Sequence, residues 1–133
     1  MILQNFKWTL LFLFIASCIT AQTADEQYAK ALKLKTEYNY KEALAAFQQL
    51  LKSDSTQLNY LTNASFCYTK SGFFFATEAE KPKYYTTAEY LAKKAIQKNA
   101  NSADAHYTYA MALGRINENA SSKQKIANAK YYH

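Results

Sequence analysis

The chain has 133 residues, with 16 Lys and Arg against 10 Asp and Glu, and therefore carries a formal net charge of +6 at pH 7. Two cysteines, two glycines and one proline exclude a disulfide-rich scaffold and a low-complexity chain. The length suffices for one domain with a hydrophobic core, and the absence of strand-like alternation predicts that this domain is helical.

The first 21 residues, MILQNFKWTLLFLFIASCITA, predict a signal peptide. One cation, Lys7, precedes an uncharged apolar run from Trp8 to Ala16 and then small residues, which is the layout of a secretory leader. The run is shorter than the roughly 20 apolar residues of a transmembrane helix. Cleavage after Ala21 predicts an exported chain, periplasmic or outer-membrane-associated, in which Cys67 is the only cysteine and no internal disulfide forms.

Two other interpretations of the leader remain open. The small residues of IASC before Cys18 resemble a bacterial lipobox, which would make Cys18 the lipidated first residue of the mature protein. In the second interpretation, the leader is not cleaved and anchors the chain in the membrane.

The mature chain opens with a predicted helix that starts at a capping box. Thr23 precedes Glu26 by three residues, so each side chain can satisfy a free backbone N–H at the helix start. Apolar residues recur at helical spacing along this segment and along the next one. A tight turn near Asn39 joins the two as an antiparallel hairpin. The apolar faces comprise Tyr28, Ala31, Leu34 and Tyr38, and then Tyr40, Ala43, Leu44, Phe47, Leu50 and Leu51.

The pattern of this hairpin returns along the chain. Ser65 and Tyr68 stand 34 residues after Ala31 and Leu34. In the return segment the distance is 45 residues, so the middle unit carries about 11 extra residues, located between Gly72 and Ala88. The matching pairs are Ala43 with Ala88, Phe47 with Ala92, and Leu50 with Ala95, and the third unit places Ala110 and Leu113 at equivalent positions.

The extra residues of the middle unit carry two expectations. Pro82 suits the first turn of a helix, so the second return helix is predicted to begin near Pro82 and not at Thr87. Phe73, Phe74 and Phe75 are expected to pack as a hydrophobic plug over the hairpin end. The alternative is an exposed aromatic patch that docks a partner or a lipid face.

The third unit stops early. Ser121 and Gln124 form a capping pair that starts a third return helix, which then ends after one or two turns. A solenoid needs a closing helix with a polar outer face. Either the chain is a fragment of a longer solenoid, which we favour, or another chain completes its last repeat.

A period of 34 residues, with small and large residues at fixed places, resembles the tetratricopeptide repeat. The segment AHYTYAMALGRINENASSKQKIANAK is similar to relatives among secreted bacterial proteins and in the regulator-of-microtubule-dynamics family. The resemblance implies an all-α fold, a right-handed α-solenoid of antiparallel helix hairpins whose last repeat is incomplete. Residues 1–21 are then the signal peptide and 22–133 the repeat domain, with units at about 24–54, 57–99 and 102–133.

The sequence offers no catalytic, cofactor-binding or metal-binding constellation. His106 is expected to pack at the start of the third unit, and no His, Cys or Asp cluster has ligand spacing. Cys67 lacks an adjacent base and is expected to pack as a small apolar side chain. There is no Gly-rich phosphate loop. We therefore expect a non-enzymatic protein without a cofactor.

The resemblance implies a binding groove on the concave face, lined by the first helix of each hairpin. Each of these helices offers an apolar or aromatic residue and a cation, which suits an extended peptide with acidic or carboxylate groups. The candidate residues are Tyr28, Leu32, Lys35, Thr62, Phe66, Lys70, Tyr107, Met111 and Arg115.

We expect this groove to serve a protein-binding or assembly scaffold of the cell envelope. Its partner is a protein or peptide and not a nucleic acid, and the chain meets a membrane only through its leader or a lipid on Cys18. The alternative function is that of a structural spacer within a longer envelope protein.

Overall fold

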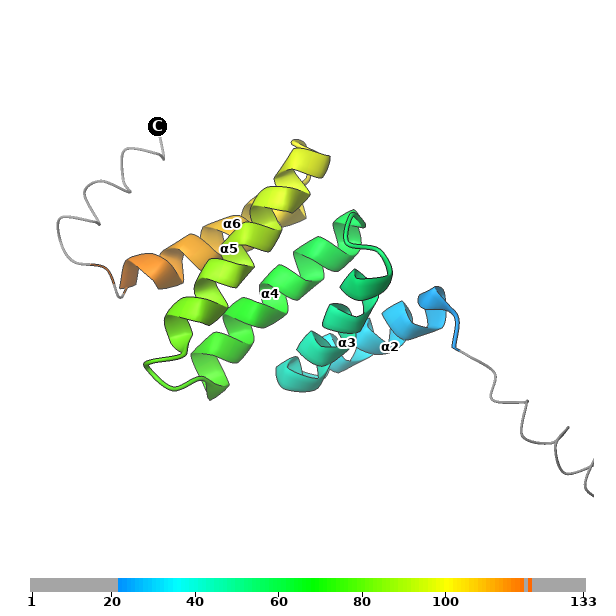
Figure 1. The fold of residues 1–133 in the computed structure, drawn as a ribbon, viewed down its shortest axis with the longest axis horizontal. Helices are drawn as coiled ribbons and strands as arrows, with labels where there is room; N and C mark the ends of the chain where they lie inside the picture. The colour runs from blue at the N-terminus through cyan, green and yellow to red at the C-terminus, as the bar shows by residue number, and fades with distance from the viewer. Residues whose placement is uncertain (1–21, 119, 121–133) are drawn as a thin grey trace, which may run out of the picture.

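The structure, a computed structural model, describes residues 22–118 and 120, which form five α-helices and no strand (Figure 1). The prediction of an all-helical chain is confirmed in this form. The predicted signal peptide, including Cys18, and the predicted third return helix with Ser121 and Gln124 lie outside the described residues. The helices are α2 (Ala24–Thr36), α3 (Tyr40–Ser53), α4 (Leu58–Phe75), α5 (Lys81–Lys98) and α6 (Ala103–Glu118).

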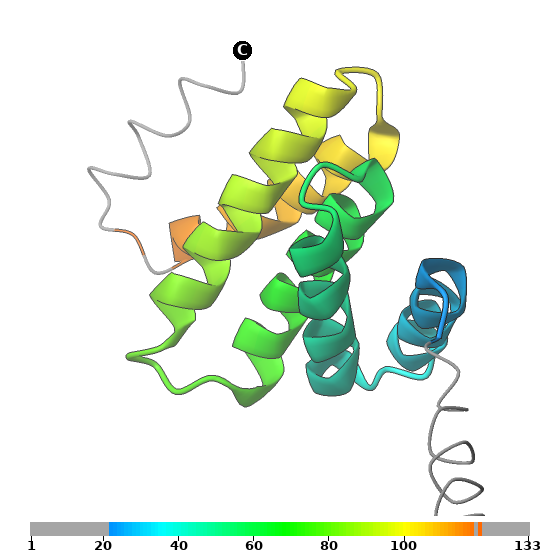
Figure 2. The same ribbon diagram turned by 45° about the vertical axis from the view of Figure 1, so that its right-hand side comes forward.

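Each helix packs against the one that follows it in the chain, and α4 also contacts α6. Figures 1 and 2 both show α4 in the middle, with α3 along one side and α5 along the other. The connections between the helices are short, so the chain turns back after each helix. No helix in the described part of the chain combines the length and apolarity that crossing a bilayer requires.

Two of the helix starts follow the local signals in the sequence. The Thr23 hydroxyl accepts a hydrogen bond from the Glu26 backbone N–H at 3.2 Å, and the Glu26 carboxylate accepts one from the Thr23 N–H at 3.2 Å. Helix α5 begins at Lys81 with Pro82 in its first turn. The capping box and the helix start near Pro82 are thus both confirmed.

The core combines a few large side chains with many small ones. Phe47 and Leu50 of α3 and Leu61 of α4 are the largest fully buried apolar side chains. Fully buried alanines on the facing helices allow the backbones to approach, and the Ser65 hydroxyl donates to the Ala88 carbonyl oxygen at 2.8 Å. Every buried side-chain polar atom in the described residues has a hydrogen-bond partner. The alanines are Ala31, Ala43, Ala64, Ala88, Ala92, Ala95, Ala105 and Ala112.

The 45-residue spacing is visible in the structure, because the backbone has the same conformation after α3 and after α5. Asp54 ends α3 with φ −147° and ψ 100°, and Asn99, 45 residues later, ends α5 with φ −149° and ψ 101°. The side-chain oxygen of each accepts a backbone hydrogen bond two residues on, from Thr56 at 2.9 Å and from Asn101 at 3.0 Å. The paired positions before these turns are buried on both helices: Tyr40 and Tyr85, Ala43 and Ala88, Phe47 and Ala92, Leu50 and Ala95.

One member of the 34-residue series differs from its expectation. Ala31 and Ser65 are fully buried, whereas Ala110 is exposed. The physical reason lies in what each helix faces: Ser65 contacts the following helix α5, and no helix follows α6 within the described residues. The buried positions on α6 are Ala105, Thr108 and Ala112.

Two other packing expectations were wrong. Phe73, Phe74 and Phe75 are 45%, 56% and 57% exposed, so they form an exposed patch and not a plug. Helix α4 continues to Phe75, and three consecutive helical residues point about 100° apart, so they cannot all face one core. His106 is also exposed, with its ring Nε2 2.8 Å from the Ala100 carbonyl oxygen, while Ala105 takes the buried position.

Candidate peptide-binding cleft

A cleft of about 130 Å³ lies between α2, α4 and α6, the first helices of the predicted hairpins. Four of the predicted groove residues line it: Lys35 from α2, Thr62 and Phe66 from α4, and Tyr107 from α6. The Phe66 ring is half-buried and the Tyr107 ring is exposed. The cleft therefore presents an aromatic surface with a lysine at its edge.

Lys35 is held in place by Asn63, on the neighbouring helix. The Lys35 ammonium donates to Asn63 Oδ1 at 2.6 Å and lies 4.7 Å from the centre of the Phe66 ring. The Asn63 amide nitrogen in turn donates to the Asn59 carbonyl at 2.7 Å and to the Tyr28 hydroxyl at 3.4 Å. These bonds fix the ammonium beside the ring.

Tyr28 supports the cleft from behind. Its ring packs against Tyr60 at 5.5 Å and against Phe47 at 6.2 Å between ring centres. Burial raises the pKa of its hydroxyl above the ordinary value, although the Asn63 hydrogen bond acts in the opposite direction. Tyr28 and the half-buried Leu32 thus pack against the core and do not line the cleft.

A second lysine shares the same aromatic ring. The Lys70 ammonium lies 5.5 Å from the centre of Phe66, so two cations contact one ring. A cation over an aromatic face gains about 0.5–1 kcal/mol at an exposed site. No carboxylate of the described residues lies within ion-pair distance of Lys35 or Lys70. Their charges are therefore not neutralised by an ion pair within that part of the chain.

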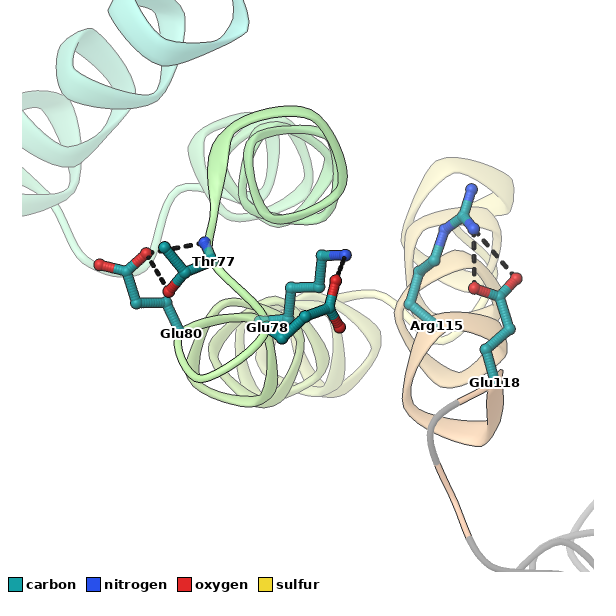
Figure 3. A network of polar contacts seen from close by, with 6 residues as sticks. Thr77, Glu78, Glu80, Arg115 and Glu118 are labelled. Atoms are coloured by element: carbon teal, nitrogen blue, oxygen red, sulfur yellow. Dashed lines mark hydrogen bonds and ion pairs between the residues drawn. The ribbon is translucent and has the colours of Figure 1, made fainter.

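The remaining predicted groove residues lie elsewhere. Arg115 donates from Nη1 to both carboxylate oxygens of Glu118, at 2.8 and 3.0 Å, and its guanidinium lies 4.1 Å from the Phe73 ring centre. Figure 3 shows this pair on α6, beside the contacts of Thr77 with Glu80 and of Glu78 with Lys81 at the α4–α5 connection. Met111 is half-buried and does not line the cleft.

Three cleft residues were missed by the sequence reasoning: Asn63, Asp104 and Thr108. Helical spacing could have found two of them, because Asn63 stands three residues before Phe66 and Asp104 three residues before Tyr107. Asp104 brings one acidic group to a cleft that otherwise carries lysine.

Residues 12–132 match the family described as Regulator of microtubule dynamics protein 1-3. The chain belongs to this family. The match includes all five helices and the cleft, and it confirms the family resemblance predicted from the last segment. No curated protein and no solved structure gives a match.

This member of the regulator-of-microtubule-dynamics family also has a larger hollow on another face. About 510 Å³ in volume, it lies between α3 and α5 and is lined by Leu51, Tyr68, Tyr90 and Leu91 among others. The Gln48 amide donates to the Tyr68 hydroxyl at its floor at 2.7 Å. Lys52 is the one cation among its lining residues.

Cys67 lies beneath the cleft of this family member as a fully buried free thiol. Burial raises its pKa to about 12, while the nearby Lys35 charge acts in the opposite direction. The thiol is therefore protonated at neutral pH and packs as an apolar group. The residues that the structure describes contain no group of three or more His, Cys, Asp or Glu side chains able to hold a metal ion.

Proposed function

We propose that this chain is a tetratricopeptide-like scaffold that binds an acidic peptide in the cleft between α2, α4 and α6. In this proposal the fold is a right-handed solenoid of antiparallel helix pairs, with units at about 24–54, 57–99 and 102–133. The matching turns at Asp54 and Asn99, and the buried residue pairs before them, support a repeat. The proposed role is binding and not catalysis.

The observation that carries the proposal is the pair of lysines on Phe66. Lys35 and Lys70 hold their ammonium groups 4.7 and 5.5 Å from the centre of the Phe66 ring, and this ring and Lys35 line the cleft between the helices. In this proposal a carboxylate of the partner pairs with Lys35 or Lys70 beside the ring, and an adjoining apolar side chain contacts the ring. Charged groups of this kind favour an acidic partner and speed its association.

Selection of a random twelve-residue peptide library on the purified full chain tests the proposal. We expect the selected peptides to be enriched in Asp and Glu. Their affinity should fall more than tenfold when Lys35→Ala or the pair Phe66→Ala and Lys70→Ala is introduced. The matched control is Lys30→Ala, an exposed lysine of α2 outside the cleft, which should change affinity by at most about twofold. Equal affinity of Lys35→Ala and the unchanged chain would remove the cleft as a binding site.

We further propose that the chain is exported to the periplasm or the inner face of an outer membrane. The cation and apolar run of residues 1–21 support a leader. Mass spectrometry of the mature N-terminus separates cleavage after Ala21 from lipidation of Cys18. An intact Met1 in envelope fractions would exclude both and leave the uncleaved anchor as the remaining interpretation.

A spacer role in a longer envelope protein is the second candidate. The exposed face of α6 at Ala110 favours it, because a further helix could cover that face as α5 covers Ser65. Reading the genomic sequence beyond His133 tests this role. Further repeats there, together with no selected peptide, would support the spacer over the binding scaffold.

A further inference from the structure

An exposed line of aromatic side chains begins where the cleft ends. We call it the aromatic strip and define it as Tyr38, Phe73, Phe74 and Phe75, which lie beside the buried Tyr40. The rings of Tyr40 and Phe74 are stacked, 5.9 Å apart and 8° from parallel, and Tyr38 and Phe73 extend this pair at 6.0 and 4.9 Å. Tyr40 also lies 5.9 Å from Phe66. Phe66, which lines the cleft, and Phe74 of the strip therefore both contact the buried Tyr40 ring.

Tyr38 contributes little to the fold. Its backbone has φ 63°, in the left-handed region that glycine and asparagine adopt at least cost. Its side chain is 75% exposed, and its ring packs edge-on against Tyr40. A bulky side chain in a costly conformation that covers almost no core indicates a role outside folding.

The three phenylalanines at the end of α4 give the same indication. Each is between 45% and 57% exposed, whereas Phe47, the large aromatic of the core, is fully buried. An aromatic side chain can bury about 150–250 Å² when a partner covers it. Neighbouring exposed aromatics of this size are typical of a docking surface.

Cations flank the strip at both ends. Lys35 and Lys70 lie at Phe66, and Arg115 lies 4.1 Å from the Phe73 ring centre. The Arg115–Glu118 pair lies at the surface, with side chains 29% and 60% exposed, and so adds little stability, and a partner carboxylate can replace Glu118. The charges therefore favour a partner with acidic groups around an apolar stretch.

The spacing of the rings fits an extended peptide. Side chains on one face of an extended chain recur every second residue, roughly 7 Å apart. Phe66 and Phe74 lie eight residues apart on α4, roughly 12 Å along the helix axis, which is close to two such steps. A flat lipid surface, by contrast, could cover the strip but could not enter the cleft between the helices at the same time.

We propose that the cleft and the aromatic strip form one track for an extended peptide. An acidic residue of the peptide lies at Phe66 beside Lys35 and Lys70, and large apolar side chains at alternating positions lie over Phe74 and Tyr38. This inference rests on the proposed function, because it extends the same cleft. It names the ligand class as an acidic segment followed by alternating apolar residues.

The peptide selection, repeated with strip variants, tests this inference. The variant combines Tyr38→Asn with Phe74→Ala, and the matched control is Tyr90→Ala, an equally exposed aromatic on α5 outside the strip. We expect selected peptides to carry one or more acidic residues followed by apolar residues at every second position. Their affinity should fall more than tenfold for the strip variant and by at most about twofold for the control, with unchanged helical circular dichroism in both.

Each other outcome has a distinct meaning. If Lys35→Ala weakens binding and the strip variant does not, the strip is overturned and the cleft stands. If no peptide is selected, the proposed function and this inference both fail. Binding of the unchanged chain to phosphatidylglycerol vesicles, lost in the strip variant while no peptide is selected, would assign the strip to a membrane surface.

Discussion

Gly72 in α4 and Tyr84 in α5 lie so close that a Cβ atom on the glycine would stand 2.8 Å from the Tyr84 Cβ. The same atom would lie 2.9 Å from Cε1 of Tyr85. Contacts this short require one helix to move, so the packing of α4 on α5 depends on the missing side chain at Gly72.

Gly72→Ala should lower the free energy of unfolding by about 1–3 kcal/mol, because it overpacks a buried contact. Gly114→Ala is the matched control, since it lies in a helix with nothing within 4 Å of its added Cβ. That control should raise the free energy of unfolding by about 0.5–1 kcal/mol through helix propensity. Urea unfolding measures both, and changes of the same sign would contradict the close packing at Gly72.

Phe47→Ala should be among the most destabilising single changes. Its ring is fully buried at the centre of the core and packs edge-on against Tyr28. Removal of a buried phenylalanine costs about 3–5 kcal/mol. Phe75→Ala, a substitution of the same kind at an exposed position, should cost at most about 0.5 kcal/mol. Thermal unfolding measures both variants. Equal melting temperatures would contradict the burial of Phe47 in the core.

Tyr38 should be replaceable without loss of stability. Tyr38→Asn keeps a residue that tolerates the left-handed backbone, so we expect the free energy of unfolding to stay equal or to rise by up to about 1 kcal/mol. Tyr38→Val should lower it, because a β-branched residue is strained at positive φ. A marked loss of stability in the asparagine variant would show that the tyrosine ring serves the fold and would weaken the case for the aromatic strip.

Cys67 should make the protein less stable in alkali. Burial raises the pKa of the thiol from 9.0 to about 12 in the folded chain. Between these values the unfolded chain releases the proton while the folded chain keeps it, so the free energy of unfolding falls as the pH rises, by up to about 1.4 kcal/mol per pH unit. Below pH 9 both states hold the proton, and this contribution is fully present.

Comparison with Cys67→Ala isolates this effect. Burial also raises the pKa of Tyr28, Tyr40 and Tyr85, but these tyrosines remain in both proteins. The unchanged chain should therefore lose stability more steeply than the variant above pH 9. Parallel curves from urea unfolding at pH 8 to 11 would contradict the burial of the thiol. Iodoacetamide should also modify Cys67 far more slowly in the folded chain than in urea.

Local signals in the sequence predicted most of the fold. The Thr23 and Glu26 pair, the position of Pro82 and the apolar stripe of α3 each depend on neighbours within one or two helical turns. The burial of Ala88, Ala92 and Ala95 followed from the 45-residue spacing, because repeated units bury equivalent positions.

The errors arose where burial depends on a distant segment. Ala110 occupies the position equivalent to Ser65, but no described helix covers it. The three phenylalanines are exposed because α4 continues through Phe75, so their side chains point in different directions around the helix. In the cleft, Lys35 and Phe66 were predicted, whereas the bond from Lys35 to Asn63 could not be read from residues 28 positions apart. Arg115 was predicted as a third cation of the groove, but a carboxylate one turn away on the same helix engages it.

Helices α4 and α5 are longer than α2 and α3 only at the end where the 76–80 connection joins them. Helices α4 and α5 have 18 residues each, against 13 and 14 in α2 and α3, yet the turns at Asp54 and Asn99 share one conformation. The conformation of the turns after α3 and α5 is thus independent of how far α4 and α5 extend at their opposite ends. Residues 76–80, which connect α4 to α5, are accordingly a site where foreign loops or whole helical turns could be inserted. The turns at Asp54 and Asn99 would keep their geometry.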